Sequence, residues 1–291
     1  MHKSGFVNII GNPNVGKSTI MNELVGEKIS IITEKSQTTR HRILGIVSGD
    51  NFQIVYSDTP GIIKPKYKLQ EKMMEFVTTS FEDADIFLYV TDVVENPKKN
   101  IEYIEKLSKV NVPVVCLINK IDLADQQKVE ELQEFWKENL PNAEIYAISA
   151  LEKFNIEGLF DRIIELLPEG PAWFPKDQLT DKTERFIVSE IVREKIFKNY
   201  QKEIPYSCEV VVEEFKEEET IIRIKVNIIV ERQSQKGIII GHKGASIKKV
   251  GTQARIDIES FFEKKVFIEF FVKVKKDWRD NDKSLRDFGY V

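Results

Sequence analysis

The chain of 291 residues is longer than one typical domain, so its length predicts two domains. With 42% hydrophobic and 31% charged residues, it has the composition of a globular protein and not of a disordered one. No apolar run approaches the roughly 18 to 20 residues that span a bilayer, and the N-terminus leads into a short strand instead of a signal peptide, so we expect a cytoplasmic location. Cys116 and Cys208 lie far apart and are expected to be buried apolar side chains, not a disulfide or a metal site.

The net charge of −4 conceals an uneven distribution. Residues 221–291 contain 16 Lys and Arg against 9 Asp and Glu, an excess of 7 positive charges, whereas the rest of the chain carries about −11. A basic C-terminal stretch on an acidic protein favours a polyanionic partner for that stretch only. Locally basic surfaces are common, so the charge alone is weak evidence for a polyanion-binding site and must be supported by a motif.

Compact apolar runs alternate with segments of helical spacing in the first part of the chain. The runs are typical of parallel strands buried on both faces, and they cover residues 6–10, 52–56, 86–91, 114–118 and 145–148. Helical spacing between or after them is shown by Leu159, Phe160, Ile163, Ile164 and Leu167. Residues 43–47 should pair with the second run through a turn at 49–51, as one antiparallel edge strand. The pattern predicts an α/β domain with a doubly wound, mostly parallel sheet.

Three prolines within residues 168–175 interrupt this pattern, because proline breaks the interior of helices and strands. We therefore expect a first domain at residues 1–168, a linker at 169–182 and a second domain at 183–291. The second domain should be α+β: a helix at about 183–200, strands at 207–215 and 220–231, helices at 234–240 and 245–262, and a strand at 265–274.

The strongest motif is Gly11-Asn-Pro-Asn-Val-Gly16-Lys17-Ser18, which matches the P-loop pattern G-x-x-x-x-G-K-[ST] between a predicted strand and an amphipathic helix. Its glycines let backbone N–H groups point at phosphates, and the helix N-terminus adds its positive dipole end. Lys17 is expected to contact the β- and γ-phosphates, and Ser18 to bind Mg²⁺. If the motif were only a glycine turn before a helix, neither the lysine nor the serine side chain would be required. The expected nucleotide contacts here are Gly11, Asn12, Asn14, Val15, Gly16, Lys17, Ser18 and Thr19.

The choice of base depends on Asn119-Lys120-Ile-Asp122, which follows the strand predicted at 114–118 and so lies at the carboxyl edge of the sheet. A carboxylate at Asp122 can accept hydrogen bonds from N1–H and the exocyclic amine of guanine, a pair of donors that adenine lacks. The motif therefore predicts guanine. Ser149 and Ala150 end the last strand of the domain, where a backbone N–H can meet the guanine carbonyl oxygen.

Two further segments are placed to sense the γ-phosphate. Asp58-Thr-Pro-Gly61 follows a strand, so Asp58 is expected in the Mg²⁺ shell and the Gly61 N–H at the γ-phosphate. Upstream, Gln37-Thr38-Thr39-Arg40 lies in a polar stretch that can close a threonine onto Mg²⁺. Thr39 is preferred over Thr38, although the sequence leaves both open. The catalytic set is thus Lys17, Thr39, Asp58 and Gly61, and the metal ligands are Ser18, Thr39 and Asp58.

These motifs, in this order, resemble the translation-factor-like class of Ras-type GTPases. Ile62 stands where Ras has a water-orienting glutamine, and an isoleucine can neither orient nor deprotonate water. We therefore expect slow intrinsic hydrolysis. Asn14 provides a side-chain oxygen near the phosphates, which suggests that K⁺ accelerates the reaction.

A second motif, Ile240-Gly241-His242-Lys243-Gly244, falls between two predicted helices of the second domain. It is the G-x-x-G loop of a KH module, whose backbone approaches nucleic-acid phosphates closely. The motif is weak alone, but the α-β-β-α-α-β order and the basic charge support a type II KH domain. The residues expected to bind RNA are Ile240, Gly241, His242, Lys243, Gly244 and Lys248.

Together, these segments resemble the Era family of bacterial GTPases, which carry a C-terminal KH domain. The shared motifs span nearly the whole chain and include residues 11–19, 37–42, 58–61, 119–122, 204–206, 240–244 and 285–290. The resemblance implies GTP and GDP as ligands, binding to the 3′ end of 16S rRNA and help in small (30S) ribosomal subunit assembly and maturation. It also implies a monomer with loose, peripheral contact with the inner membrane. His242 departs from the family, where Asn-Lys is common inside G-x-x-G.

Two other functions compete with a GTP-hydrolysing switch. In one, the nucleotide only stabilises an RNA-binding protein, and substitutions of Lys17 or Asp58 that spare folding would leave its action intact. In the other, the chain is a P-loop enzyme of small-molecule metabolism such as a nucleotide kinase. The Asn119-Lys-Ile-Asp122 motif and the absence of an evident acceptor site oppose the second alternative.

Overall fold

The computed structural model describes residues 1–290, which form two compact units. The first unit contains residues 1–64 and 73–181, and the second contains residues 65–72 together with the chain from 182 onward. Among the described residues, no helix is long and apolar enough to cross a membrane. Both cysteines are buried with free thiols, as predicted.

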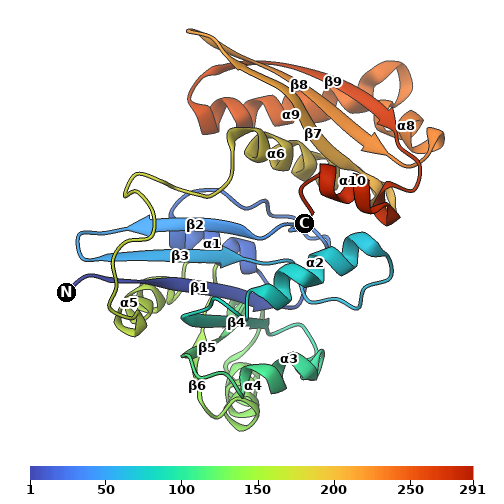
Figure 1. Cartoon of the computed structure of the whole chain (residues 1–291). Coiled ribbons are helices and arrows are strands. Elements are labelled where there is room, and N and C mark those ends of the chain that lie inside the picture. Colours follow the sequence, from blue (N-terminus) through green and yellow to red (C-terminus); the bar gives the residue numbers. More distant parts are fainter. Residues whose placement is uncertain (291) are drawn as a thin grey trace. The chain divides into compact units, whose positions relative to one another are not determined.

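A six-stranded sheet is the centre of the first unit (Figure 1). Its strand order is β2-β3-β1-β4-β5-β6, and every neighbouring pair is parallel except β2 with β3. The strands are β1 (Lys3–Gly11), β2 (Ile43–Ser48), β3 (Phe52–Asp58), β4 (Ile86–Asp92), β5 (Val114–Asn119) and β6 (Ala143–Ala147). The antiparallel edge strand and the mostly parallel sheet are those predicted from the apolar runs.

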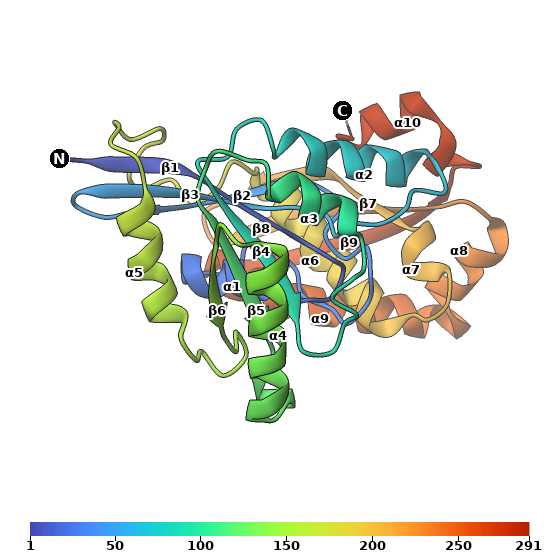
Figure 2. The ribbon, with the colours of Figure 1, turned by 90° about the horizontal axis from the view of Figure 1, so that it is seen from below.

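Helices pack on this sheet through their apolar stripes. They are α1 (Lys17–Val25), α2 (Lys68–Thr79), α3 (Ile101–Leu107), α4 (Gln126–Asn139) and α5 (Ile156–Leu166). Figure 1 shows α1 behind the sheet and α2 in front of it. Helices α3 and α4 share a buried core with the sheet, in which Trp136 packs edge-on against Tyr89. Figure 2 shows α4 lying along β5, which it contacts.

The strand order places several loops at one edge of the sheet. Strand β1 is central. Strands β2 and β3 lie on one side of it, and β4, β5 and β6 lie on the other, so the strand order reverses direction at β1. In doubly wound sheets, ligands bind outside the carboxyl ends of the strands at such a switch point. The loops that follow β1, β3, β4, β5 and β6 are therefore the ones in a position to form a site.

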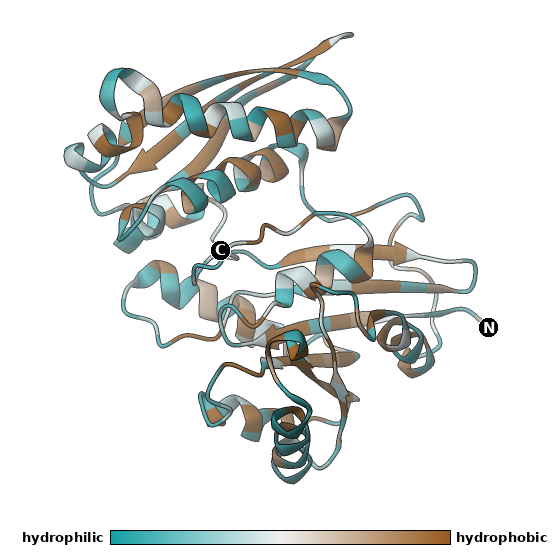
Figure 3. Cartoon of the chain, turned by 180° about the vertical axis from the view of Figure 1, so that it is seen from behind, coloured by the Kyte–Doolittle hydropathy of each residue, from teal (hydrophilic) through white to brown (hydrophobic). Residues whose placement is uncertain are grey.

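The second unit has the predicted α-β-β-α-α-β order. Its main elements are α6 (Glu184–Asn199), β7 (Glu209–Glu217), β8 (Ile221–Val230), α8 (Gln233–Ile240), α9 (Ala245–Phe262) and β9 (Lys265–Val274). Strand β8 pairs antiparallel with β7 and parallel with β9. Figure 3, seen from behind, shows α6 and α9 together on one face of the sheet, where the strands are largely apolar.

Two short helices of this unit were not predicted, namely α7 (Ile204–Ser207) and α10 (Asp282–Asp287). The buried Trp278 donates its indole N–H to the carbonyl of Ser207 at 3.1 Å. The buried Tyr290 donates its hydroxyl to Oε2 of Glu209 at 2.7 Å. The C-terminal segment is thus held to the start of β7 by polar contacts made by buried aromatic side chains.

Candidate nucleotide site and nucleic-acid interface

The loop between β1 and α1 has the backbone of a phosphate-binding loop. Asn14 and Gly16 take φ angles of 67° and 99°, and α1 begins at the next residue, Lys17. A Cβ at Gly16 would lie 2.2 Å from Nδ2 of Asn119, so only glycine fits there. Thr19 lies in the first turn of α1 and is half-buried. The loop therefore presents the N-terminus of a helix to the carboxyl edge of the sheet.

Lys17 is buried inside this loop. Its Nζ donates to the carbonyl oxygens of Gly11 at 3.2 Å and Asn12 at 2.8 Å. Burial lowers the pKa of Lys17 to about 8, an effect partly offset by the negative charges of Asp58 and Glu95. An anion at the helix N-terminus would supply the compensating negative charge that this ammonium group otherwise obtains from carbonyl dipoles.

Three oxygen-bearing side chains from three separate segments converge beside Lys17. Ser18 Oγ donates to Oδ2 of Asp58 at 2.7 Å and lies 3.0 Å from Oγ1 of Thr39, while Thr39 lies 3.4 Å from the same Asp58 oxygen. Thr38 is turned away, because its hydroxyl donates to the carbonyl of Lys35 at 2.6 Å. Of the two threonines left open by the sequence, the structure brings Thr39 to Ser18 and Asp58.

The donor set fits Mg²⁺. One carboxylate and two hydroxyls are the hard oxygen ligands that this ion prefers, and it commonly takes few protein ligands and keeps phosphates or waters for the rest. Among the described residues, Oδ1 of Asp58 is buried without a hydrogen-bond partner. Burial raises the pKa of this carboxyl above its usual value, against the opposing charge of Lys17. A cation at this point would satisfy the unpartnered oxygen and favour the ionised form.

The loop after β5 is tied directly to the P-loop. Asn119 donates its side-chain amide to the carbonyl of Val15 at 2.8 Å and accepts the backbone N–H of Ala150 at 3.0 Å. Lys120 takes a positive φ of 62° and donates Nζ to the carbonyl of Asn14 at 2.6 Å. These contacts set the distance between the phosphate-binding loop and the segment predicted to read the base.

Asp122 is exposed at this edge, and its orientation is fixed from the loop after β6. Ser149 Oγ donates to Oδ1 of Asp122 at 2.5 Å. Ser149 and Asp122 thus come together as the sequence predicted for a base pocket. The Ala150 N–H, expected at the guanine carbonyl, is donated to Asn119 here.

The segment after β3 lies against the P-loop. A Cβ at Gly61 would approach Cα of Pro13 to 2.7 Å, so a side chain there would push the two segments apart. The backbone N–H of Ile62 donates to the carbonyl of Gly11 at 3.1 Å, and the Ile62 side chain is 2% exposed. A buried isoleucine confirms that this position offers no polar group to water.

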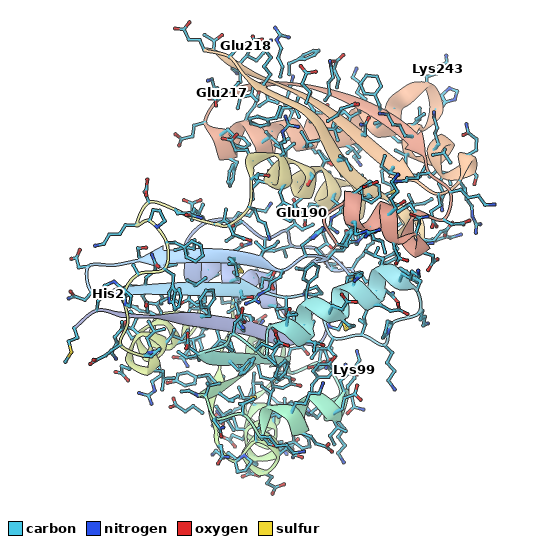
Figure 4. All side chains as sticks on the ribbon, viewed as in Figure 1. His2, Lys99, Glu190, Glu217, Glu218 and Lys243 are labelled. Atoms are coloured by element: carbon cyan, nitrogen blue, oxygen red, sulfur yellow. The ribbon has the colours of Figure 1, made fainter. Side chains whose placement is uncertain are left out.

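In the second unit, the G-x-x-G segment joins α8 to α9 through a tight turn. Gly241 and Gly244 have φ of 71° and 79°, and Lys243 is also left-handed at 49°. His242, Lys243 and Lys248 are exposed, and Ile240 is half-buried. Figure 4 shows Lys243 at the edge of this unit, with its side chain pointing outward. The loop therefore presents main chain and positive charge to solvent, as a phosphate-binding loop requires.

The polar residues at the end of β4 and in the loop after it were not predicted from the sequence. Glu95 accepts the side-chain amide of Asn12 at 2.7 Å, and Asn100 donates to Oδ1 of Asn12 at 2.5 Å. Asp92 accepts Nζ of Lys120 at 2.5 Å. A signal was present, because Asp92 and Glu95 directly follow a buried strand and so must lie at the carboxyl edge of the sheet.

Fold and site together define a class of protein, namely a P-loop GTP-binding domain followed by a KH module. Family patterns agree: one described as 50S ribosome-binding GTPase matches residues 6–120, and one described as KH domain matches residues 203–279. The GTPase Era of Clostridium kluyveri is 46% identical over 292 residues, covering 100% of both chains. That of Syntrophus aciditrophicus is 47% identical over 294 residues, covering 100% of this chain and 96% of its own. The chain therefore belongs to the Era family of GTPases.

Solved structures of this family match the whole chain. Era in complex with MgGDPNP and nucleotides 1506–1542 of 16S ribosomal RNA has a TM-score of 0.95 and 40% identity, covering 100% of both chains. A variant of Aquifex aeolicus Era bound to GDP and AlF4⁻ has a TM-score of 0.95 and 40% identity, covering 99% of both chains. The predicted fold class is thereby confirmed.

Proposed function

We propose that this chain is a slow GTP-hydrolysing switch that binds the 3′ end of 16S rRNA and assists assembly and maturation of the small ribosomal subunit. The observation that carries the proposal is the convergence of Ser18, Thr39 and Asp58 beside Lys17. Segments from the P-loop, the polar stretch after α1 and the end of β3 meet here, at a point where all three could sense one common ligand.

In this proposal, Lys17 binds the β- and γ-phosphates, and the backbone N–H of Gly61 senses the γ-phosphate. Mg²⁺, when bound by Ser18, Thr39 and Asp58, neutralises charge on the β- and γ-phosphates. The Era structure with MgGDPNP supports this ligand pair. Loss of the γ-phosphate removes the partner of Thr39 and Gly61, so both loops are released in the GDP state.

Asp122 is proposed to select guanine. The hydrogen bond from Ser149 leaves the second carboxylate oxygen of Asp122, and the second lone pair of the first, for the donors of the base. Asn119 and Lys120 hold the P-loop at the matching distance. The Ala150 N–H, which Asn119 accepts here, would change partner to meet the guanine carbonyl.

Asn14 is proposed as a K⁺ ligand. Its side-chain nitrogen donates to the carbonyl of Glu34 at 2.8 Å, so it is the amide oxygen of Asn14 that would coordinate a cation. A monovalent cation there would stabilise charge that develops as the γ-phosphate departs. Such a device would offset the absence of a polar side chain at Ile62.

The G-x-x-G loop is proposed to hold RNA phosphates, with Ile240, Gly241 and Gly244 forming the close backbone approach and His242, Lys243 and Lys248 adding charge. The Era complex with nucleotides 1506–1542 of 16S ribosomal RNA supports this RNA as the partner. Action as a monomer in the cytoplasm, and a peripheral contact with the inner membrane, remain predictions from the family resemblance.

The first experiment compares GTP hydrolysis by the wild type, Thr39→Ala and the matched variant Thr38→Ala. Thr39→Ala removes a hydroxyl from the Mg²⁺ shell, so its single-turnover rate should fall roughly 10- to 100-fold, whereas Thr38→Ala should keep most of the rate. Equal rates for all three proteins would contradict the metal assignment. Absence of hydrolysis by the wild type in Mg²⁺ and K⁺ would contradict the proposed activity itself.

The second experiment tests the RNA. Single-stranded RNA with the 16S 3′-end sequence should bind the GTP-loaded protein more tightly than a scrambled RNA of equal length at the same salt, since base contacts add to the common phosphate term. Equal affinities for both RNAs would mean that the protein binds only through nonspecific attraction to phosphates, which would contradict the assigned partner.

A further inference from the structure

We infer that Asn100 is a positioning residue for GTP hydrolysis, which holds the main chain after Gly61 against the P-loop. The inference rests on the proposed GTPase activity and adds to it a residue outside the nucleotide-binding motifs. Asn100 is the last residue of the loop between β4 and α3, and Lys99, labelled in Figure 4, precedes it.

One amide group of Asn100 reaches both segments. Its Nδ2 donates to Oδ1 of Asn12 in the P-loop at 2.5 Å and to the carbonyl of Ile62 at 3.3 Å. A second link between the same segments is the hydrogen bond from the Ile62 N–H to Gly11. The Ile62 N–H is thus held by a backbone hydrogen bond, and the Ile62 carbonyl is held by the side chain of Asn100.

The Asn12 amide is itself fixed in orientation. Its Nδ2 donates to Oε2 of Glu95 at 2.7 Å, and the other oxygen of Glu95 accepts the hydroxyl of Thr91 at 2.8 Å. A carboxylate accepts only, so Asn12 must turn its nitrogen to Glu95 and its oxygen to Asn100. Burial raises the pKa of Glu95, whereas the hydrogen bonds from Thr91 and Asn12 oppose this effect and favour the ionised, accepting form. Hydrogen bonds therefore connect β4 to Ile62 in one series, in which each donor and each acceptor is fixed. The series runs from Thr91 through Glu95, Asn12 and Asn100 to Ile62.

The backbone of Asn100 also depends on the residue type. It has φ of 55° and ψ of 45°, in the left-handed region, directly before α3. Asparagine adopts this region more readily than other side chains, and glycine adopts it without cost. Glycine could therefore replace the backbone role of Asn100 but not its hydrogen bonds, which separates the two roles experimentally.

The contact of Asn100 with Ile62 matters because Ile62 brings no polar side chain to the attacking water. Orientation of the water must then come from main chain near Gly61 and from bound ions, and a displacement of about 1 Å in such groups can cost roughly 100-fold in rate. Asn100 does not touch Lys17 or Asp122. Its contact with the P-loop is with the side chain of Asn12, whereas the groups expected at the phosphates there are backbone N–H groups. The expected effect is therefore on the chemical step and not on nucleotide affinity.

The test compares the wild type with Asn100→Gly, Asn100→Asp and the exposed neighbour variant Lys99→Ala. Asn100→Gly keeps the left-handed backbone and removes the amide, and Asn100→Asp keeps the shape but sets an acceptor against the oxygens of Asn12 and Ile62. The single-turnover rate should fall roughly tenfold or more in both Asn100 variants, with GDP affinity within about twofold of the wild type. Lys99→Ala should behave as the wild type.

A second readout uses GDP with AlF4⁻, which stands in for the transferring phosphoryl group. Its affinity should fall in parallel with the rate in both Asn100 variants. Unchanged rates, or parallel losses of GDP affinity and of thermal stability, would overturn the inference. A wild type that does not hydrolyse GTP would instead overturn the proposed function, so the two failures are distinguishable.

Discussion

The side chain of Asp122 shows how one residue sets the choice of base. Ser149 orients its carboxylate, and the neighbouring Asn119 and Lys120 fix its loop to the P-loop, so we expect the carboxylate to meet the base in a defined geometry. Because guanine and xanthine differ in a single exocyclic group, a change of Asp122 from acceptor to donor should change which of them is bound.

We predict that Asp122→Asn weakens GTP and favours xanthosine triphosphate. A mispaired buried hydrogen bond costs about 1 to 3 kcal/mol, which corresponds to a loss of GTP affinity of about 5- to 150-fold. Asp125→Asn is the matched control, since Asp125 caps α4 by accepting the N–H of Lys128 and asparagine caps equally well. Competition binding with both nucleotides measures the preference, and an Asp122→Asn variant that keeps wild-type affinities would rule out its contact with the base.

At the scale of elements, the loops that follow the strands divide the work of the site. In the proposed site, the P-loop forms the phosphate cradle, the loops after β5 and β6 form the base pocket, and the segments around Thr39 and Gly61 sense the γ-phosphate. The loop after β4 holds these parts together through Glu95 and Asn100. Because Ile62 brings no polar side chain to the attacking water, we expect main chain near Gly61 and bound ions to supply what the catalytic glutamine of other GTPases supplies.

We predict that K⁺ accelerates hydrolysis through Asn14. Turnover by the wild type should be faster in potassium than in sodium buffer at matched ionic strength, because the smaller sodium ion would be held differently by the same oxygens. Asn14→Gly keeps the positive φ of 67° accessible and removes the side-chain oxygen, so the difference between the two buffers should vanish in it. Identical turnover of the wild type in both buffers would eliminate this role for the ion.

The regular elements were predictable because their patterns are local. The strands of both sheets were expected from apolar runs, and α9 from a stripe in which Val250, Ala254 and Ile258 are indeed buried. Helix α10 was missed because six residues give no period, although Asn281 before it caps the N–H of Ser284. Asn100 was missed for another reason: its partners lie 88 and 38 positions away, and no local pattern encodes such a contact.

At the scale of the whole molecule, the distribution of charge assigns different partners to the two parts. The excess of positive charge lies in residues 221–291, which contain the G-x-x-G loop, and the acidic remainder carries the nucleotide motifs. Phosphate contacts release counterions, so RNA binding should weaken steeply with salt. The proline-containing segment at 168–175 separates the two sets of motifs in the chain, and we propose that their arrangement depends on the nucleotide.

We predict that the nucleotide state of the protein controls its affinity for RNA. If GTP favours an arrangement that exposes the G-x-x-G loop, RNA must favour GTP over GDP by the same factor, because coupling between binding sites is reciprocal. Lys243→Asp, and more so Gly244→Asp, should abolish RNA binding by setting a carboxylate against phosphate while leaving GTP affinity unchanged. Lys216→Asp, an equal charge change at an exposed residue of β7, is the control and should bind RNA nearly as the wild type does.

The most direct test is the affinity for single-stranded RNA with the 16S 3′-end sequence, measured at fixed salt on the protein loaded with a non-hydrolysable GTP analogue or with GDP. A switch with this coupling should bind the RNA more tightly in the GTP-analogue state, by the several-fold or greater factor typical of coupled sites. Identical affinities in the two states would contradict the account.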